Sequence, residues 1–260
     1  MATRPKKAQL VSVLGPLLDT QVLDDENSRR RQSRTFHASS IETCGRQQWY
    51  GLKGYTQDPA MDHPEWKRDA EAGTALHDIY QRDLLKLGLV VPTQEVLDYA
   101  GWRIEDYTLA GVVPLPEFAN ELPLPPNKYQ IGGRIDSVIR YRDTLLVVDI
   151  KTVKQKAFDD MPGNFRFKKY YAQLQVYMHL SGIQYGLVLC ISRNDSQKKE
   201  YLVTYNPEWC EVQFSRIAEL KKMLDEDILP PAEPDWFSCG FCPFNELCSL
   251  NIGGKKIDES

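Results

Sequence analysis

The chain of 260 residues lacks a long hydrophobic run, an excess of positive charge and an internal repeat. No stretch is apolar over the about 20 residues that a membrane span needs. The early run from Leu10 to Leu18 is interrupted by Gly15 and Pro16, so we expect no secretory signal. These absences predict a cytoplasmic or nucleoid-associated protein that is neither secreted nor bound to a membrane. A net charge of -4 also excludes a protein coated in positive charge, so nucleic-acid binding would need local patches.

Six cysteines are present, and three of them lie close together as Cys239-x-x-Cys242-x-x-x-x-x-Cys248. The expected reducing compartment argues against a disulfide framework, and close spacing of this kind is typical of thiolate ligands to a metal. A zinc ion and an iron-sulfur cluster place the same demand on sequence, so the spacing leaves both open. We expect Cys190 and Cys210, which lie in apolar surroundings, to be packed in the core.

A β-hairpin is predicted where Tyr129 to Tyr141 and Thr144 to Thr152, both rich in β-branched and aromatic residues, are separated only by Arg142 and Asp143. In a hairpin that turns there, Asp136 faces Asp149 with both side chains on one face.

Two facing carboxylates repel each other, and a divalent cation would neutralise them. Alternation along the strand places Lys151 on the same face as Asp149, while the carbonyl of Ile150 can turn toward the same ion. The alternative is a pair of surface carboxylates, one bound to Arg134 and the other to Lys151.

A helix from about residue 65 to 87 is predicted by apolar residues that recur at intervals of three and four, with His77 on its inward face. Gly73, one turn earlier, leaves space for a metal or a phosphate near the backbone. A histidine in such a place is otherwise a core residue with one hydrogen bond. Together with two carboxylates it makes a mixed nitrogen and oxygen site that suits Mn²⁺ as well as Mg²⁺.

The order of these candidates resembles the PD-(D/E)XK nuclease superfamily in its RecB-like exonuclease branch: His77, Asp136, Asp149, Lys151, Gln173 and Tyr177. With Cys44, the three C-terminal cysteines are similar to the iron-sulfur subgroup, which includes CRISPR-associated RecB-like and AddB-type nucleases. The resemblance spans residues 36 to 250, most of the chain. One departure is Asp149, because this branch often has glutamate there.

The resemblance implies an α/β fold with a restriction-endonuclease-like core, in which a mixed central sheet is flanked by helices. Interleaved motifs predict one domain over residues 36–260, after a basic and flexible arm over residues 1–35. Cys44 would be the fourth thiolate beside Cys239, Cys242 and Cys248, and the resemblance favours a [4Fe-4S] cluster over zinc. The cluster would join the two ends of the domain in a lobe formed by about residues 40–55 and 230–252.

The implied activity is that of a metal-dependent deoxyribonuclease that degrades DNA from its ends, prefers single strands and serves recombination, repair or DNA processing. The resemblance gives the metal ligands as His77, Asp136, Asp149 and the Ile150 carbonyl. Lys151 would orient the attacking water or stabilise the transition state, and Gln173 and Tyr177 would hold the strand or the lysine. The alternative is a DNA-end-binding or partner-dependent processing subunit with little nuclease activity alone, whose nuclease centre is vestigial or works only in a complex. Its partner would be a helicase, a recombination protein or a CRISPR-adaptation protein. A zinc-stabilised nucleic-acid-binding protein without catalysis is a third interpretation.

A basic and aromatic segment follows the hairpin and is a candidate for binding a single strand, whose bases would stack on aromatic rings. Its members are Lys154, Lys156, Arg166, Lys168, Lys169 and Tyr170. The alternative is a solvated loop whose aromatic residues turn into the core. Further predicted elements are a proline-rich connector (113–127), helices (166–181 and 207–229) and strands (184–192 and 199–205).

Overall fold

The computed structural model describes residues 18–21, 35–57, 64–234 and 236–248. The basic residues of the predicted N-terminal arm, between Arg4 and Arg34, lie outside this range. In the described part of the chain, no helix is both long enough and apolar enough to cross a membrane.

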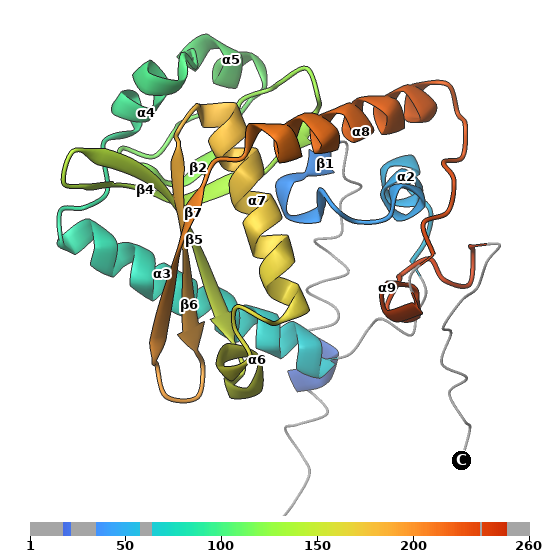
Figure 1. Cartoon of the computed structure of the whole chain (residues 1–260), viewed down its shortest axis with the longest axis horizontal. Helices are drawn as coiled ribbons and strands as arrows, with labels where there is room; N and C mark the ends of the chain where they lie inside the picture. The colour runs from blue at the N-terminus through green and yellow to red at the C-terminus, as the bar shows by residue number, and fades with distance from the viewer. Residues whose placement is uncertain (1–17, 22–34, 58–63, 235, 249–260) are drawn as a thin grey trace, which may run out of the picture.

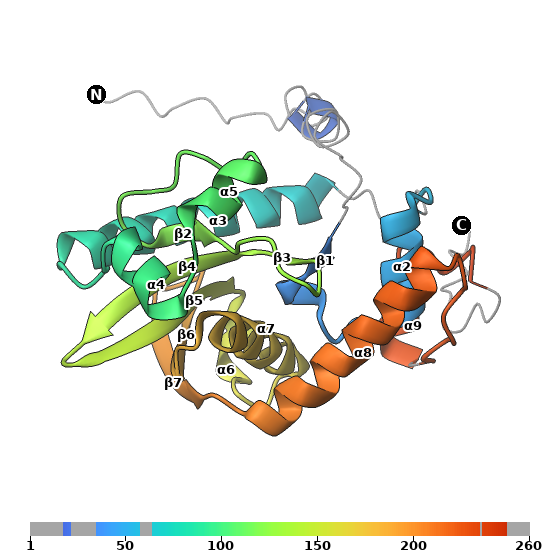
Figure 2. The same cartoon turned by 90° about the horizontal axis from the view of Figure 1, so that it is seen from above.

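A mixed five-stranded sheet forms the centre of the fold, in the order β2-β4-β5-β6-β7. All neighbours are antiparallel except β5 and β6, which run parallel. Helix α3 (Pro64–Lys86) covers one face, and α7 (Phe165–Ser181) covers the other (Figures 1 and 2). The predicted α/β architecture is therefore confirmed. The strands are β2 (Asn120–Pro123), β4 (Arg134–Tyr141), β5 (Thr144–Val153), β6 (Tyr185–Ser192) and β7 (Lys198–Thr204).

The hairpin of β4 and β5 has the predicted register, since Tyr141 pairs with Thr144 and Ser137 pairs with Val148. Arg142, in the turn, adopts a left-handed conformation with φ 54°. Two-residue hairpin turns require such conformations, which match the twist of the strands. The short turn therefore fixes which residues face each other across the hairpin.

Helix α7 passes through the middle of the molecule between the sheet and α8 (Pro207–Asp225), as Figure 2 shows. The side chain of Asn164 caps its N-terminus by accepting a hydrogen bond from the Arg166 N–H. The helix packs closely on β6, because a Cβ at Gly186 would lie 3.1 Å from Leu174. This packing buries Gln173 and Tyr177.

The connector over residues 113–127 contains an unpredicted strand, β2, at the edge of the sheet. Pro123 occupies its last position, where the missing N–H costs no central ladder bond. Helices α4 (Thr93–Ala100) and α5 (Ile104–Leu109) were also not predicted. Helix α6 (Gln155–Asp159) follows β5.

Segments from the two ends of the described chain lie side by side in a lobe beside α8, which we call the cysteine lobe: α2 (Gly45–Lys53), α9 (Trp236–Gly240) and residues 241–248 (Figure 2). It has a small core of Trp49, Tyr50 and Phe244. A Cβ at Gly45 would lie 2.6 Å from Leu220, so glycine there lets α2 approach α8. Strand β1 (Phe36–His37) pairs with β3 (Ile131–Gly132), and the 3₁₀ helix η1 (Ala38–Ser40) follows it.

Candidate functional site

Four elements meet at one cleft beside the open end of the hairpin. Helix α3 contributes His77, β2 contributes Glu121, β4 contributes Asp136, and β5 contributes Ile150 and Lys151. The structure thus brings together predicted residues that are more than 70 positions apart in the sequence.

Asp136 connects the hairpin to α3. Its Oδ2 accepts a hydrogen bond of 2.7 Å from the backbone N–H of Ile150, and the same oxygen lies 2.7 Å from Nε2 of His77. Burial lowers the pKa of His77, but the bond to Asp136 and its charge outweigh that effect, so the pKa is raised. The hairpin register, continued by one residue, places Asp149 opposite Asp136, as predicted.

Glu121 joins the site although the sequence did not indicate it. Its Oε1 lies 3.5 Å from Nδ1 of His77, and ligand atoms of His77, Glu121 and Asp136 lie within 4.8 Å of one another. Glu121 has φ 49°, an unusual left-handed conformation for a residue in a strand. Gln81 donates 2.8 Å hydrogen bonds to Oε1 of Glu121 and to the carbonyl of Asp136, which holds the glutamate in place.

Lys151 is held on three sides. Its Nζ lies 2.7 Å from Oδ1 of Asp149, donates to Oε1 of Gln173 at 3.1 Å and lies 5.3 Å from the ring centre of Tyr170. Gln173 in turn donates to the hydroxyl of Tyr177 at 2.9 Å. Burial disfavours the ammonium form, but the Asp149 carboxylate outweighs it and raises the pKa of Lys151. Gln173 and Tyr177 therefore lie behind the lysine.

Asp149 is fully buried, at 0% exposure. Burial raises the pKa of its carboxyl, and the charge of Lys151 opposes that rise. Oδ1 binds Lys151, whereas Oδ2 has no hydrogen-bond partner in the described part of the chain. A buried carboxylate oxygen without a partner costs free energy unless a cation satisfies it. The donors that the structure groups within 4.8 Å are His77, Glu121 and Asp136, a nitrogen and oxygen set that fits a divalent ion, whereas Asp149 lies outside this group.

Gly73 brings α3 close to β5 at the edge of the cleft. A Cβ on this residue would lie 3.1 Å from Oγ1 of Thr152, and both residues line the cleft. The sequence predicted space near the backbone at Gly73, and the structure places this glycine one turn from His77.

The predicted DNA-binding segment divides between surface and interior. All five basic residues, Lys154, Lys156, Arg166, Lys168 and Lys169, are exposed. Lys154 also pairs with Asp69 at 2.5 Å. Tyr170 is half-buried against Lys151. Phe167 packs edge-on against Tyr201, with ring centres 4.9 Å apart, so this aromatic residue turns inward.

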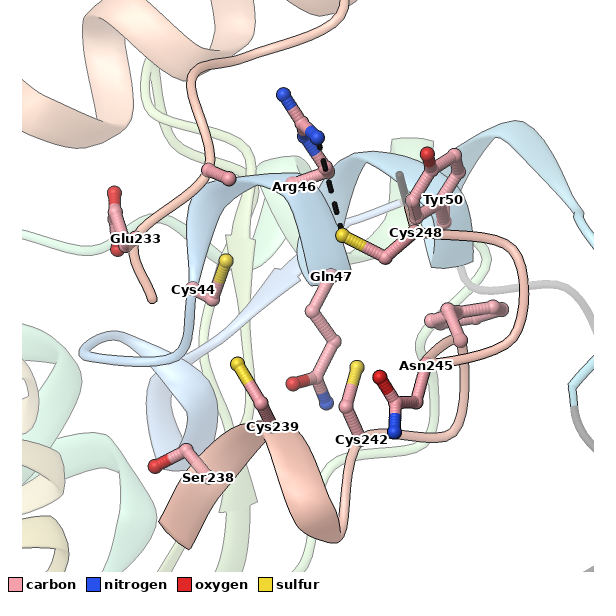
Figure 3. Close-up of a pocket in the computed structure, with 12 residues that line it drawn as sticks. Cys44, Arg46, Gln47, Tyr50, Glu233, Ser238, Cys239, Cys242, Asn245 and Cys248 are labelled. Carbon is pink, nitrogen blue, oxygen red and sulfur yellow. Dashed lines mark hydrogen bonds between the residues drawn. The ribbon is translucent and has the colours of Figure 1, made fainter. Parts of the chain in front are cut away.

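The four predicted thiolate ligands line a single pocket in the cysteine lobe, although Cys44 is far from the others in sequence: Cys44, Cys239, Cys242 and Cys248. All are free cysteines, and Figure 3 shows their sulfurs turned toward a common space. Arg46 donates to Sγ of Cys248 at 3.8 Å and to the carbonyl of Pro230 at 3.0 Å. Burial raises the pKa of the Cys242 thiol, and the neighbouring cysteines raise it further.

Arg216 of α8 joins the cysteine lobe to the core by hydrogen bonds and an ion pair, without a metal. Its guanidinium donates to the carbonyls of Ile41 and Thr43 at 3.0 and 2.8 Å. It also pairs with Glu233 at 2.8 Å. One side chain therefore holds the segments that lead into Cys44 and into the C-terminal cysteines.

Cys190 and Cys210 are both fully buried at 0% exposure, which confirms their predicted place in the core. Burial raises the pKa of each thiol to about 11. Neither residue lines the cysteine pocket.

Comparison with known families and structures gives an independent result. The family profile of the PD-(D/E)XK nuclease superfamily matches residues 66–249. The crystal structure of SSO0001 is similar with a TM-score of 0.53 and 16% identity over 93% of this chain and 98% of that one. A comparison with curated proteins finds no match.

Two further solved structures are similar at lower scores. The alkaline exonuclease LHK-Exo from Laribacter hongkongensis has a TM-score of 0.43 and 13% identity over 80% of this chain and 95% of that one. A phage-related exonuclease from Haemophilus somnus 129PT has a TM-score of 0.38 and 17% identity over 74% of this chain and 94% of that one. At 16% identity, the likeness to SSO0001 shows a shared fold alone.

Proposed function

Because the chain belongs to the PD-(D/E)XK nuclease superfamily, we propose that it is a metal-dependent deoxyribonuclease that degrades DNA from its ends, with a preference for single strands. The observation that carries this proposal is the convergence of His77, Asp136 and Lys151 on one cleft, with Lys151 bound to the buried Asp149, whose other carboxylate oxygen has no partner in the described part of the chain. The preference for ends rests on the order of the motifs, which resembles RecB-like exonucleases.

His77, Asp136, Asp149 and the carbonyl of Ile150 would hold Mn²⁺ or Mg²⁺, with Glu121 as a further ligand. When bound, such an ion binds a phosphoryl oxygen, lowers the pKa of its water and neutralises developing charge. Asp136 links two of the other proposed ligands, because its Oδ2 contacts both His77 and the backbone N–H of Ile150.

Lys151 would place its ammonium against the attacking water or the phosphoryl oxygens, as a compact charge suited to either. The contacts with Asp149 and Gln173 fix the position of this ammonium before substrate arrives. Tyr177 in turn fixes Gln173. A preorganised charge of this kind needs little rearrangement during the reaction.

The cysteine pocket supports a second metal centre of structural purpose. Cys44, Cys239, Cys242 and Cys248 offer four sulfurs in one pocket, a donor set that fits a [4Fe-4S] cluster or zinc. We favour the cluster because of the resemblance to iron-sulfur nucleases. It would stabilise the packing of the cysteine lobe on α8, with no ligand taking part in hydrolysis.

The deciding experiment offers purified protein with Mn²⁺ or Mg²⁺ to four substrates: end-labelled linear and circular DNA, each single- and double-stranded. Degradation of linear DNA with resistance of circles would support a need for ends, and the position of the lost label would give the polarity. Equal cleavage of circles would show an endonuclease instead. No cleavage of any substrate would contradict the proposal and favour a DNA-end-binding or partner-dependent subunit in a recombination, repair or CRISPR-adaptation complex.

The metal content of the cysteine pocket is tested separately. Iron and sulfide analysis with a visible absorption spectrum should show about four irons per chain and a brown protein. Cys239→Ser should lose both, whereas Cys190→Ser should keep them. Stoichiometric zinc in a colourless protein would contradict the iron-sulfur assignment.

A further inference from the structure

We propose that Arg134 binds a backbone phosphate of the DNA strand that enters the cleft, next to the phosphate held at the metal site. This inference rests on the proposed nuclease function and adds a substrate-binding residue to it.

The strand geometry places Arg134 on the face of β4 that carries Asp136 and lines the cleft. It begins the strand two residues before Asp136, so the two side chains point to the same side of the sheet. The residue between them, Ile135, is fully buried at 0% exposure, whereas Arg134 is exposed. Arg134 also lines the cleft beside His77 and Lys151.

The two cationic side chains of the cleft, Lys151 and Arg134, differ in the number of contacts that they make with other protein groups. The ammonium of Lys151 already contacts Asp149, Gln173 and the ring of Tyr170, and its side chain is 20% exposed. It has little freedom to follow a second phosphate.

Arg134 forms no ion pair with any described carboxylate, although Asp78, Glu121 and Asp136 line the same cleft. The carboxylates nearest the metal site have other partners: Asp136 binds His77 and Ile150, and Glu121 accepts from Gln81. Within the described part of the chain, the guanidinium therefore keeps its donors for a ligand from outside.

The guanidinium of Arg134 indicates which chemical group such a ligand would offer. A guanidinium presents planar N–H groups that match two oxygens of one phosphate, and it stays charged at every working pH. A DNA strand whose scissile phosphate lies at His77 and Asp136 brings its neighbouring phosphate within the same cleft. Arg134 would thus fix the register of the strand relative to Lys151.

The test measures binding of a fluorescent single-stranded oligonucleotide by anisotropy at several salt concentrations, with Ca²⁺ in place of Mn²⁺. Loss of one phosphate contact on a single strand makes the slope of log K against log salt shallower by about 0.7. We expect that change in Arg134→Gln, with affinity lower by roughly tenfold because a charge-assisted hydrogen bond is lost. Arg134→Lys should keep the slope, because the charge remains, but lose cleavage rate through poorer register.

The matched control is Arg142→Gln, which removes the same side chain from the opposite, exposed end of the same hairpin. It should keep the wild-type slope, affinity and cleavage rate. Thermal unfolding of each variant verifies that the exposed substitutions leave the fold intact.

Wild-type slope and affinity in Arg134→Gln, from a protein that cleaves DNA, would overturn this inference and leave the nuclease function standing. A wild-type protein that neither cleaves nor binds DNA would overturn both.

Discussion

The backbone N–H of Ile150 donates a 2.7 Å hydrogen bond to Oδ2 of Asp136. At this point of the hairpin a backbone donor of β5 binds a side chain of β4, and the same oxygen contacts His77 of α3. The carboxylate is thus fixed between two elements before any ion binds. Its position depends on the register of the hairpin and on the packing of α3 together.

Replacing Asp149 with asparagine should lower manganese-dependent cleavage by at least about 100-fold, as loss of a preorganised electrostatic group does. The change keeps the buried volume but removes the charge, so DNA binding and the fold should persist. Cleavage of an end-labelled oligonucleotide measures the effect. Asp143→Asn, at the exposed turn of the same hairpin, should behave as wild type. Full activity in Asp149→Asn would refute its proposed role.

Glu121→Gln should weaken Mn²⁺ binding by about tenfold or more, a loss of the size seen when groups that support a metal site are removed. The amide keeps the shape and an oxygen that can accept from Gln81, so β2 should stay in place. Isothermal titration calorimetry or electron paramagnetic resonance of Mn²⁺ measures the affinity for the ion without relying on catalysis. Glu117→Gln, an exposed glutamate on the same connector, is the control. Wild-type affinity for Mn²⁺ in Glu121→Gln, as in the Glu117→Gln control, would exclude Glu121 as a ligand.

Tyr177→Phe should destabilise the protein by about 1–3 kcal/mol, because the buried amide of Gln173 loses its acceptor. Gln173 would then hold Lys151 less firmly, so kcat should fall more than KM changes. Urea unfolding and steady-state kinetics separate the two effects. Tyr141→Phe removes a hydroxyl that is exposed at the end of β4 and should change neither quantity. An unaltered kcat would show that Tyr177 only fills space.

Cysteine labelling should divide the six thiols into two groups. The thiolate is the reactive form, and burial raises the pKa of Cys190 and Cys210 to about 11. Both therefore stay protonated at pH 8 in the folded protein and gain reactivity only as the pH rises toward that value. After a chelator removes bound metal, iodoacetamide should label the four pocket cysteines, and mass spectrometry identifies them. Rapid labelling of Cys190 in native protein would contradict its burial.

The hairpin could be predicted because its information is local. A two-residue turn fixes the register, so the positions of Asp136 and Asp149 follow from counting outward from Arg142. The helical period placed His77 inward in the same way. The predicted helix extended to about residue 87, whereas α3 ends at Lys86 and Leu87 is 71% exposed.

Glu121 shows what local patterns miss. It lies among prolines, which argue against a strand, and its left-handed backbone breaks the alternation that identifies one. Only pairing with β4 makes this segment a strand and turns Glu121 toward His77. The position of Glu121 beside His77 depends on this tertiary contact, which no local sequence pattern indicates.

The location of Glu121 on an edge strand would link the proposed ion binding to local folding. Among the strands of the described residues, β2 has a neighbour on one side only, and three register pairs join it to β4. An ion that contacts Glu121 only when β2 is paired adds its binding free energy to the stability of that strand. Amide exchange in β2 would then slow as the ion concentration rises, so the edge of the sheet would report the occupancy of the site.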